Sequence, residues 1–421
     1  MTSALPNYDQ AAAQVAACAE ALGRRQPAFE RVELGQASGR VLAQPLAADC
    51  DQPPFARSTR DGYACRAAEA SRHTPLAIVG AARAGDRPSG PLLPGGVWEI
   101  MTGAPVPSGA DAVMMLEHVK VDGCAKVRKV RLLPPRTAKP GENIVAQGEQ
   151  AQAGDELLPA GTTLHFGQIA LAAACGYSAL EVFVRPRVAI LTTGDELVSV
   201  GSSPAPGQIR NSNAPMLAAM VAAAGGQPWI LPTAADNAQA LDEALAQAAG
   251  ADLLLISGGV SAGKFDLVEP ALARIGARTH FTGVRIQPGK PTVFGELPRG
   301  TTSPTLPFFG LPGNPVSSAA TFLLFAAPVL AALAGSRESL PHFCLAKLAP
   351  HVDRHAKPGL TRFLPAFCDF SAIAGQPPQV SFVPWHGSGD LVALAHSNCF
   401  LVVPEGSHSP EPGSLVRILL P

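Results

Sequence analysis

Aromatic and charged residues are scarce in this sequence. Of its 421 residues, 5% are aromatic and 15% are charged, and 32 Lys+Arg balance 33 Asp+Glu to a net charge of -1. Balanced charge argues against the broad basic face that nucleic-acid binding requires. Few aromatic rings argue against base stacking. We therefore expect no nucleic-acid partner.

Sequence motifs for zinc sites, disulfide frameworks, secretion and membrane insertion are also missing. The eight cysteines form no C-x-x-C pair and fit neither a zinc site nor a disulfide framework, so we expect reduced thiols in a cytoplasmic protein. The opening MTSALPNYDQ lacks the pattern of a signal peptide. Residues 316–335 carry no charge and approach membrane-spanning length, but they include Pro328 and lack basic or aromatic anchors at their start. We expect a buried helix there and no membrane partner.

The distribution of hydrophobic residues and of Pro/Gly turns indicates several domains with different secondary structure. Hydrophobic residues make up 47% of the chain, and 41 Gly and 41 Pro supply many turns. Short apolar runs between Pro/Gly turns over residues 46–147 predict a β-rich region, and residues 340–421 return to that style. Between them, strands are predicted at 187–193, 228–234, 251–257, 292–297 and 306–310, and helices at 213–224, 237–249, 266–275 and 315–333. This alternation predicts a mostly parallel, doubly wound α/β domain.

Three of these strands end in small-residue turns. They are Thr193-Gly194, Ser257-Gly258-Gly259, and a third turn that ends in Gly313-Asn314-Pro315. Ligands of open parallel sheets sit outside the carboxyl ends of strands, where glycines let backbone N–H groups approach a phosphate. Asn followed by Pro is also typical of a helix start. The turns together predict a phosphorylated, anionic ligand.

Acidic residues accompany the turns. They are Asp195, Glu196, Asp236 and Asp266. Carboxylates beside a phosphate repel it unless a cation intervenes, so Mg²⁺ is the expected companion. The open alternative is that each acid only stabilises a helix start. Lys290, between two prolines, suits an oxyanion, or is simply solvated.

Two further sequence patterns overlap the second of these turns, and a third lies after the α/β region. Residues 258–264 resemble a Walker A loop, but Phe265 replaces the hydroxyl that should hold Mg²⁺. Residues 259–263 match a G-x-S-x-G nucleophile elbow, which leaves a Ser261 hydrolase as an alternative. His351 and His355 have the spacing of zinc ligands on a helix, although nearby prolines leave little room for one.

Taken together, the motifs resemble the molybdopterin molybdenumtransferase family, the MoeA and gephyrin E-domain type. The resemblance covers nearly the whole chain and runs in order through DGYA (61–64), TGAPVP (102–107), TGDEL (193–197), SGGVS (257–261), PGKP (288–291) and GLPGNPVS (310–317), with GSGDL (387–391) and NCF (398–400) in the tail. Several ordered motifs of this length are hard to obtain by chance.

The resemblance implies an elongated homodimer with four domains in each subunit. These are a discontinuous linking α+β domain (1–47 and 148–184), a β-hammerhead-type domain (48–147), a MogA-like α/β molybdopterin-binding domain (185–335) and a C-terminal β-barrel (336–421). The cleft would lie between the α/β domain of one subunit and the β-domain of the other. A molybdopterin adenylyltransferase is the expected further partner.

The resemblance also implies a reaction. Molybdenum from molybdate is inserted into adenylylated molybdopterin, and AMP is released. The catalytic residues would be Asp61, Glu196, Asp266 and Lys290, and the metal ligands Asp195, Glu196, Asp236 and Asp266. The residues that bind molybdopterin would be Thr102, Thr193, Gly194, Ser257, Gly258, Gly259, Ser261, Gly313, Asn314, Pro315 and Ser317.

Some positions depart from the commoner family pattern. Gln150 stands where Asp is usual, Asn237 where a second Asp is frequent, and Gln287 where Lys is frequent. Leu267 replaces a frequent Tyr, and Arg60 a frequent Met. The loss of an acid keeps a second hypothesis open, namely a non-catalytic or retuned molybdopterin-binding paralogue that acts as a scaffold or carrier.

Overall fold

The computed structural model describes the chain apart from residues 1–4, 25–26, 87–89, 125–126, 260–266, 300–302, 339–340, 351–358, 372–374 and 407–409. The chain divides into two compact units. The first consists of Met1–Ala43, Gly161–His165 and Leu180–Pro421, and the second of Gln44–Ala160 and Phe166–Ala179. Each unit is therefore assembled from segments that are distant in the sequence.

A six-stranded sheet forms the centre of the α/β region in the first unit. Its strand order is β16-β13-β17-β21-β20-β18. In that order the bounds are Gln227–Ile230, Arg187–Thr192, Leu253–Ser257, Ser303–Leu311, Val293–Arg299 and Arg278–Phe281. The first four strands are parallel, and the β21–β20 and β20–β18 pairs are antiparallel. Because only residues 300–302 separate β20 from β21, the chain has no room for the crossover that a parallel pair needs.

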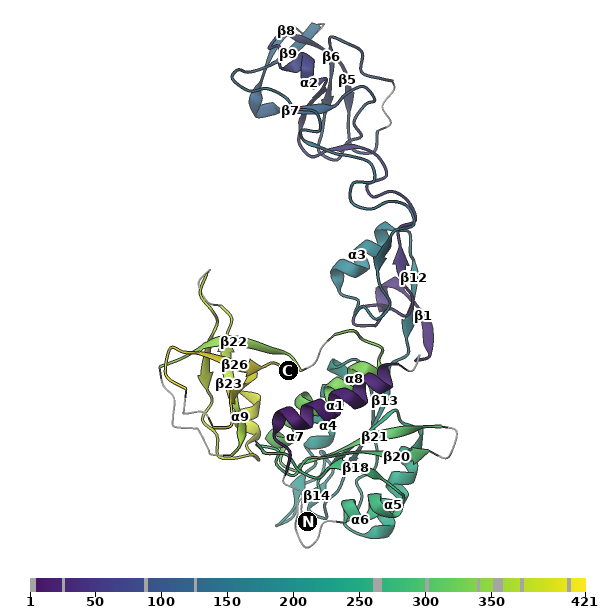
Figure 1. Cartoon of the computed structure of the whole chain (residues 1–421), viewed down its shortest axis with the longest axis vertical. Coiled ribbons are helices and arrows are strands. Elements are labelled where there is room, and N and C mark those ends of the chain that lie inside the picture. The colour runs from purple at the N-terminus through teal and green to yellow at the C-terminus, as the bar shows by residue number, and fades with distance from the viewer. Residues whose placement is uncertain are drawn as a thin grey trace. The chain divides into compact units, whose positions relative to one another are not determined.

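Helices cover both faces of this sheet (Figure 1). On one face lie α1 (Tyr8–Gly23), α4 (Asn213–Ala223) and the continuous run α7 (Pro315–Thr321), η4 (Phe322–Ala326) and α8 (Ala327–Leu333). On the other lie α5 (Ala238–Gln247), followed by η3 (Ala248–Gly250), and α6 (Val268–Arg274). Along β13, Val188 and Ile190 join the first core, and Ala189 and Leu191 join the second. Burial on both faces explains the unbroken apolar run in the sequence, and the predicted doubly wound fold is confirmed.

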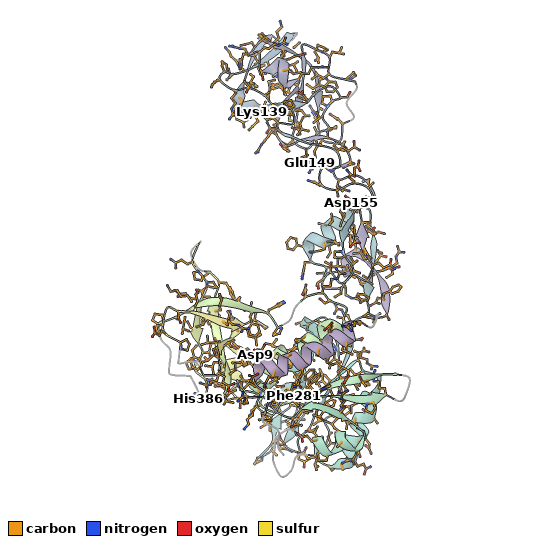
Figure 2. The ribbon with its side chains drawn as sticks, viewed as in Figure 1. Asp9, Lys139, Glu149, Asp155, Phe281 and His386 are labelled. Atoms are coloured by element: carbon orange, nitrogen blue, oxygen red, sulfur yellow. The ribbon has the colours of Figure 1, made fainter. Side chains whose placement is uncertain are left out.

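The uncharged stretch near residue 320 belongs to the core. The run Pro315–Leu333 is 19 residues long and apolar enough to cross a membrane, but 78% of its apolar window is buried inside the protein. Its middle segment, η4, is π-helical. The Phe325 ring lies 5.9 Å from that of Phe281, a residue labelled in Figure 2. Packing on the sheet therefore accounts for this composition, as predicted.

The first helix also packs on this core. Asn7 and Gln10 form a capping box at the start of α1, in which each side chain bonds the other's backbone N–H. Ala11, Val15 and Leu22 on α1 are buried in the same core as α8. This helix lies in the segment assigned above to the linking domain. The four domain boundaries themselves stay a prediction.

The C-terminal part of the first unit is a closed barrel of five strands. Around the barrel the order is β23-β24-β22-β26-β25, and β25 pairs again with β23. In that order the bounds are Thr361–Asp369, Gln379–Phe382, Phe343–Leu348, Leu415–Leu419 and Cys399–Val403. The short strand β19 (Ile286–Gln287) adds to β23, and helix α9 (Leu391–Ala395) precedes β25. Leu364, Val380, Leu401 and Ile418 are buried in one cluster, and the predicted C-terminal β-barrel is confirmed.

The second unit is mainly β-structure, as predicted. Its six-stranded sheet has the order β7-β4-β6-β5-β9-β8, with bounds Ala112–Met115, Gly62–Cys65, Gly96–Ile100, Leu76–Ala82, Val127–Leu132 and Val119–Cys124. Its other elements are β2 (Leu46–Ala47), β3 (Arg57–Ser58), β10 (Ile144–Val145), β11 (Glu156–Leu158), α2 (Ala67–Ala70), η2 (Leu116–His118) and α3 (Phe166–Ala174). The remaining short elements of the chain are β1 (Phe29–Glu33), η1 (Leu34–Gln36), β12 (Ala179–Phe183), β14 (Leu197–Val198) and β15 (Ile209–Arg210).

Candidate functional site

The three small-residue turns meet at one edge of the α/β sheet. β13, β17 and β21 are neighbours, and their last residues pair in register, Thr192 with Ser257 and Ser257 with Leu311. The Thr193 N–H donates to Ser257 O (3.1 Å), and the Gly258 N–H donates to Leu311 O (3.3 Å). The chain passes from β13 to β16 on one side and then to β17 on the other. A topological switch point, where open α/β sheets bind ligands, therefore lies between β13 and β17.

A cleft of about 850 Å³ opens at this edge. Many of the predicted site residues line it, namely Thr193, Gly194, Glu196, Asp236, Ser257, Gly258, Gly259, Gly313, Asn314 and Pro315. They come from the three turns and from the segment after β16. The structure therefore brings most of the predicted α/β-domain site into one cavity.

Glycine shapes the middle turn of the cleft. Gly258 has φ +97° and Gly259 has φ +60°, a region that strains any residue with a Cβ. A Cβ on Gly258 would lie 2.5 Å from Thr193 O, and one on Gly259 would lie 2.7 Å from Val268 Cγ2. Within the described part of the chain, the amides of Gly259 and Gly313 donate to no protein oxygen. These turns can therefore pack closely and still offer N–H groups to an anion.

Polar residues that our sequence analysis did not single out also line the cleft, among them Arg210, Asn211 and Asn213. Asn213 is the first residue of α4, and its Nδ2 donates to Ser257 Oγ (2.9 Å) and to Gly313 O (2.6 Å). The signal in the sequence was the polar run 210–213 before an apolar helix. It was not recognised because the preceding strand, β15, has only two residues, so no strand end marked the run.

Three carboxylates gather at the mouth of the first turn. Glu196 and Asp236 line the cleft, and Asp195 Oδ1 accepts a hydrogen bond from the Asp236 N–H (3.0 Å). Partial loss of solvent, and then repulsion by Asp195 and Glu196, raise the pKa of Asp236 above its ordinary 3.8. A cation would relieve this crowding of negative charge.

These carboxylates suit Mg²⁺, which needs few protein ligands, better than a metal ion whose ligands all come from the protein. Among the described residues, no three His, Cys, Asp or Glu side chains form a group that could hold a metal. Mg²⁺ commonly binds one or two carboxylates and completes its shell with water and substrate phosphate. The carboxylates beside the amide-rich turns fit that pattern. The seven cysteines with described side chains are free thiols.

Lys290 and Ser317 are predicted site residues that do not line the cleft. The Lys290 side chain is exposed, and of its immediate neighbours Pro291 lines the cleft. Ser317 is buried inside α7 and is not among the lining residues.

Asn314 occupies the N-cap position of α7, as predicted, but its side chain does not cap the helix. Its Nδ2 donates instead to Ser388 Oγ (2.8 Å).

The barrel region contributes part of the cleft wall. The backbone carbonyl of Ser388 accepts a hydrogen bond from the Val316 N–H (3.0 Å) and so takes over part of the capping of α7. Gly389 and Leu391 line the cleft. These residues belong to the GSGDL run of the tail, for which the sequence suggested no role. The separation of 74 residues between Asn314 and Ser388 kept this contact from being predicted.

Asp61 and Thr102 form a pair in the second unit. The Thr102 N–H and Oγ1 both donate to Asp61 Oδ1, at 2.6 and 2.8 Å. These two bonds hold the pKa of Asp61 below its ordinary 3.8. Asp61 precedes β4 and Thr102 follows β6, and β4 and β6 are antiparallel neighbours. The role expected of this pair towards the cleft stays a prediction.

Several sequence hypotheses lie outside the described residues. Asp266, the expected fourth carboxylate, and Ser261, the expected ligand contact and alternative hydrolase nucleophile, belong to residues 260–266. The Walker-like loop overlaps the same segment. The possible zinc ligands His351 and His355 belong to residues 351–358. All of these stay predictions.

One departure from the family pattern has a local structural role. Asn237 Oδ1 accepts a hydrogen bond from the Ala240 N–H (2.9 Å) and caps α5, a role that Asp fills equally well. Gln150 is exposed, and its backbone N–H donates to Gln52 O (2.8 Å). Nothing in the structure explains Gln287, whose Oε1 is buried and has no hydrogen-bond partner in the described part of the chain.

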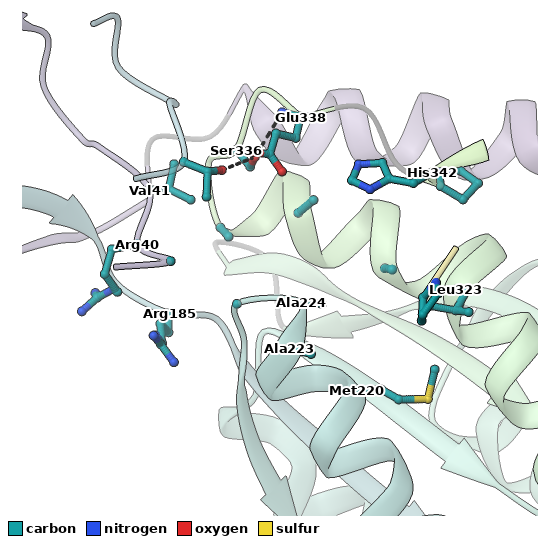
Figure 3. A pocket seen from close by; sticks show the side chains of 18 of the residues that line it. Arg40, Val41, Arg185, Met220, Ala223, Ala224, Leu323, Ser336, Glu338 and His342 are labelled. Carbon is teal, nitrogen blue, oxygen red and sulfur yellow. Dashed lines mark hydrogen bonds between the residues drawn. The ribbon is translucent and has the colours of Figure 1, made fainter. Parts of the chain in front are cut away.

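A second cavity, of about 330 Å³, lies elsewhere in the first unit (Figure 3). Figure 3 shows Met220 and Leu323 on its apolar wall, with Arg40, Glu338 and His342 also around it. None of the predicted site residues lines this cavity. We therefore place the candidate site in the cleft at the sheet edge.

Known proteins resemble this chain over nearly its whole length. A molybdopterin molybdenumtransferase of Nostoc sp. is 36% identical over 404 residues, which are 93% of this chain and 88% of the relative. One of Bacillus subtilis is 33% identical over 411 residues, 94% of this chain and 91% of the relative. The crystal structure of the molybdopterin biosynthesis moeA protein of Pyrococcus horikoshii OT3 superposes with a TM-score of 0.78 at 28% identity, covering 99% and 100% of the two chains.

Family descriptions match consecutive parts of the chain. Residues 7–176 match the MoeA N-terminal region (domain I and II), 189–332 a probable molybdopterin binding domain, and 347–420 the MoeA C-terminal region (domain IV). The second match contains the candidate site in the α/β region. The order of these matches, the fold and the extent of the similarity agree, and the chain belongs to the molybdopterin molybdenumtransferase (MoeA) family.

Proposed function

We propose that this chain inserts molybdenum from molybdate into adenylylated molybdopterin and releases AMP. As a member of its family, the chain has a role in molybdenum cofactor biosynthesis. The observation that carries the finer proposal is the single cleft in which three amide-bearing turns face a group of carboxylates. That combination suits a pyrophosphate accompanied by a cation.

The turns would bind the pyrophosphate. The amides of Gly259 and Gly313, which donate to no oxygen of the described residues, come from neighbouring turns, so they can donate to different phosphate oxygens. Thr193 lines the same space, and its buried Oγ1 has no hydrogen-bond partner in the described ranges. When the phosphoanhydride bond breaks, negative charge grows on the departing AMP oxygen. Fixed N–H groups stabilise such charge without reorganisation, and the ammonium of Lys290 can approach from its exposed loop.

Glu196 and Asp236, which line the cleft, would hold Mg²⁺ together with Asp266 from the segment that the structure does not describe, while Asp195 holds the backbone of Asp236. Loss of solvent first, and repulsion by Asp195 and Glu196 after it, raise the pKa of Asp236, and a bound cation would offset both. Bound there, Mg²⁺ would neutralise charge on the pyrophosphate and on the leaving group. The carboxylates would hold the cation beside the amide-rich turns.

The working protein is proposed to be a cytoplasmic homodimer. In it, Asp61 and Thr102 of one protomer would reach the cleft of the other. The hydrogen bonds from Thr102 keep Asp61 ionised and fix its orientation, as a charged contact requires. A molybdopterin adenylyltransferase would supply the substrate, because the reaction consumes an adenylylated pterin.

The decisive test is incubation of the purified protein with adenylylated molybdopterin, Mg²⁺ and molybdate, with AMP followed by chromatography. We expect release of AMP together with metal-loaded cofactor. Glu196→Gln is the matched control, since it keeps the shape of the side chain and removes its charge. Tight pterin binding without AMP would instead support the non-catalytic carrier, and absence of both binding and release would refute the proposal.

A further inference from the structure

We propose that Asn213 is a positioning residue, which holds two of the ligand-binding turns at the spacing that the pyrophosphate requires. This inference rests on the proposed function. Asn213 stands at the start of α4, outside the three turns. Its Nδ2 donates to Ser257 Oγ at the end of β17 (2.9 Å) and to Gly313 O in the turn after β21 (2.6 Å). A single amide group therefore bridges both turns.

The orientation of this amide follows from its partners. The carbonyl oxygen of Gly313 can only accept, so the Asn213 atom that contacts it must be the NH₂ nitrogen. Both of its protons are then used, one on each turn. The amide of Gly313, next to this carbonyl, is one of the amides free to meet a phosphate. A change at Asn213 would therefore move a donor that we assign to the ligand.

The other end of the side chain points to a role beyond stability. Asn213 Oδ1 is buried and finds no hydrogen-bond partner among the described residues. Thr193 lines the same cleft, and its buried Oγ1 has no hydrogen-bond partner in the part of the chain that the structure describes. Both atoms belong to residues that line the cleft, so a ligand or a bound water in the cleft can supply the missing partners.

The test compares Asn213→Ala with Asn398→Ala. Asn398 is a matched control in the barrel, because its Oδ1 accepts from the Cys368 N–H (2.7 Å) and its Nδ2 donates to Cys368 O (2.8 Å). Steady-state AMP release and the melting temperature are measured for both variants and for the wild type. For Asn213→Ala we expect kcat to fall roughly 100-fold and KM to rise up to about tenfold, with an almost unchanged melting temperature. For Asn398→Ala we expect a lower melting temperature and wild-type kcat.

Two results would overturn the inference. One is an Asn213→Ala variant with kcat close to that of the wild type. The other is a loss of kcat that comes with a loss of melting temperature at least as large as that of Asn398→Ala, which is the signature of a structural role.

A second measurement separates this inference from the proposed function. If the wild type releases no AMP, the proposed function fails, and calorimetric titration with inorganic pyrophosphate and Mg²⁺ decides the role of Asn213. Binding about tenfold weaker in Asn213→Ala than in the wild type would support it. Equal binding in the two proteins would refute it.

Discussion

Replacing Gly258 by Ala tests whether close approach of the turns makes the site. Gly258 has φ +97°, and a Cβ there would meet Thr193 O at 2.5 Å and Thr193 Oγ1 at 3.2 Å. The nearer atom belongs to the backbone, so no side-chain rotation can relieve the contact. One of the two turns must move by several tenths of an ångström, which displaces the amides that we assign to the pyrophosphate.

The size of the effect follows from two contributions. The left-handed conformation costs a residue with a Cβ about 1–2 kcal/mol, and a forced backbone shift costs about 1–3 kcal/mol, so Gly258→Ala should lose about 2–5 kcal/mol of stability. Gly225→Ala is the control, because Gly225 has φ +82° and no atom within 4 Å of an added Cβ. That variant should lose only the first contribution. It should also keep wild-type turnover, since Gly225 does not line the cleft.

The measurements are calorimetric unfolding and steady-state AMP release on the two variants and the wild type. We expect kcat of Gly258→Ala to fall on the order of 100-fold, because misplacing binding groups by a fraction of an ångström to 1 Å has effects of that size. If Gly258→Ala and Gly225→Ala behave alike in both stability and turnover, close contact between the turns is irrelevant to the site.

Four further substitutions probe the rest of the site. Glu196→Gln should stop AMP release and leave molybdopterin binding intact, and release at the wild-type rate would contradict the role of its charge. Asp236→Asn should raise the Mg²⁺ concentration needed for half-maximal turnover, measured by Mg²⁺ titration, whereas an unchanged titration would remove it from the metal site. Asn237→Ala should cost about 1 kcal/mol of stability through loss of the α5 cap, with unchanged turnover, as calorimetry and AMP release can show. Thr102→Val should raise the pKa of Asp61 towards 3.8, as followed by NMR titration of the carboxyl group. Because the folded-state pKa is lowered, the stabilisation from these bonds is present above about pH 4 and is lost as pH falls through that pKa. The backbone N–H of residue 102 stays in this variant, so only part of the shift should be lost, and a pKa that does not move would show that the Thr102 hydroxyl is not a cause.

Much of the α/β fold could be predicted from local patterns. The strands β13 and β17 appear as unbroken apolar runs because helices cover both faces of the sheet. The helix α5 begins after an Asn that caps it, one residue later than predicted. Strands of two residues, such as β14 and β15, were not predicted, because so short a run shows no hydrophobic periodicity. The π-helical segment η4 escaped as well, since its apolar composition is that of an ordinary buried helix.

Part of the candidate site could likewise be predicted from the sequence, and part could not. Glycine-bearing turns at strand ends could be predicted, because the ends of parallel strands meet at one edge of a sheet. The bridging Asn213 and the wall from Ser388 to Leu391 could not, because their partners lie far away in the chain. The buried position of Ser317 inside α7 was also missed, since helix register alone does not show which side a neighbouring domain covers.

The amino-acid sequence by itself determined the alternation of strands and helices, the turns with glycine at their strained positions, and the acids that follow them. Each of these depends on residues within a few positions of one another, where backbone sterics and periodicity act. Only the tertiary structure decided which amide bridges which turn, that Asn314 bonds the barrel rather than its own helix, and that Asp195 holds the backbone of Asp236. Those contacts join segments brought together by packing of the sheet, helices and barrel, and packing depends on the whole folded chain.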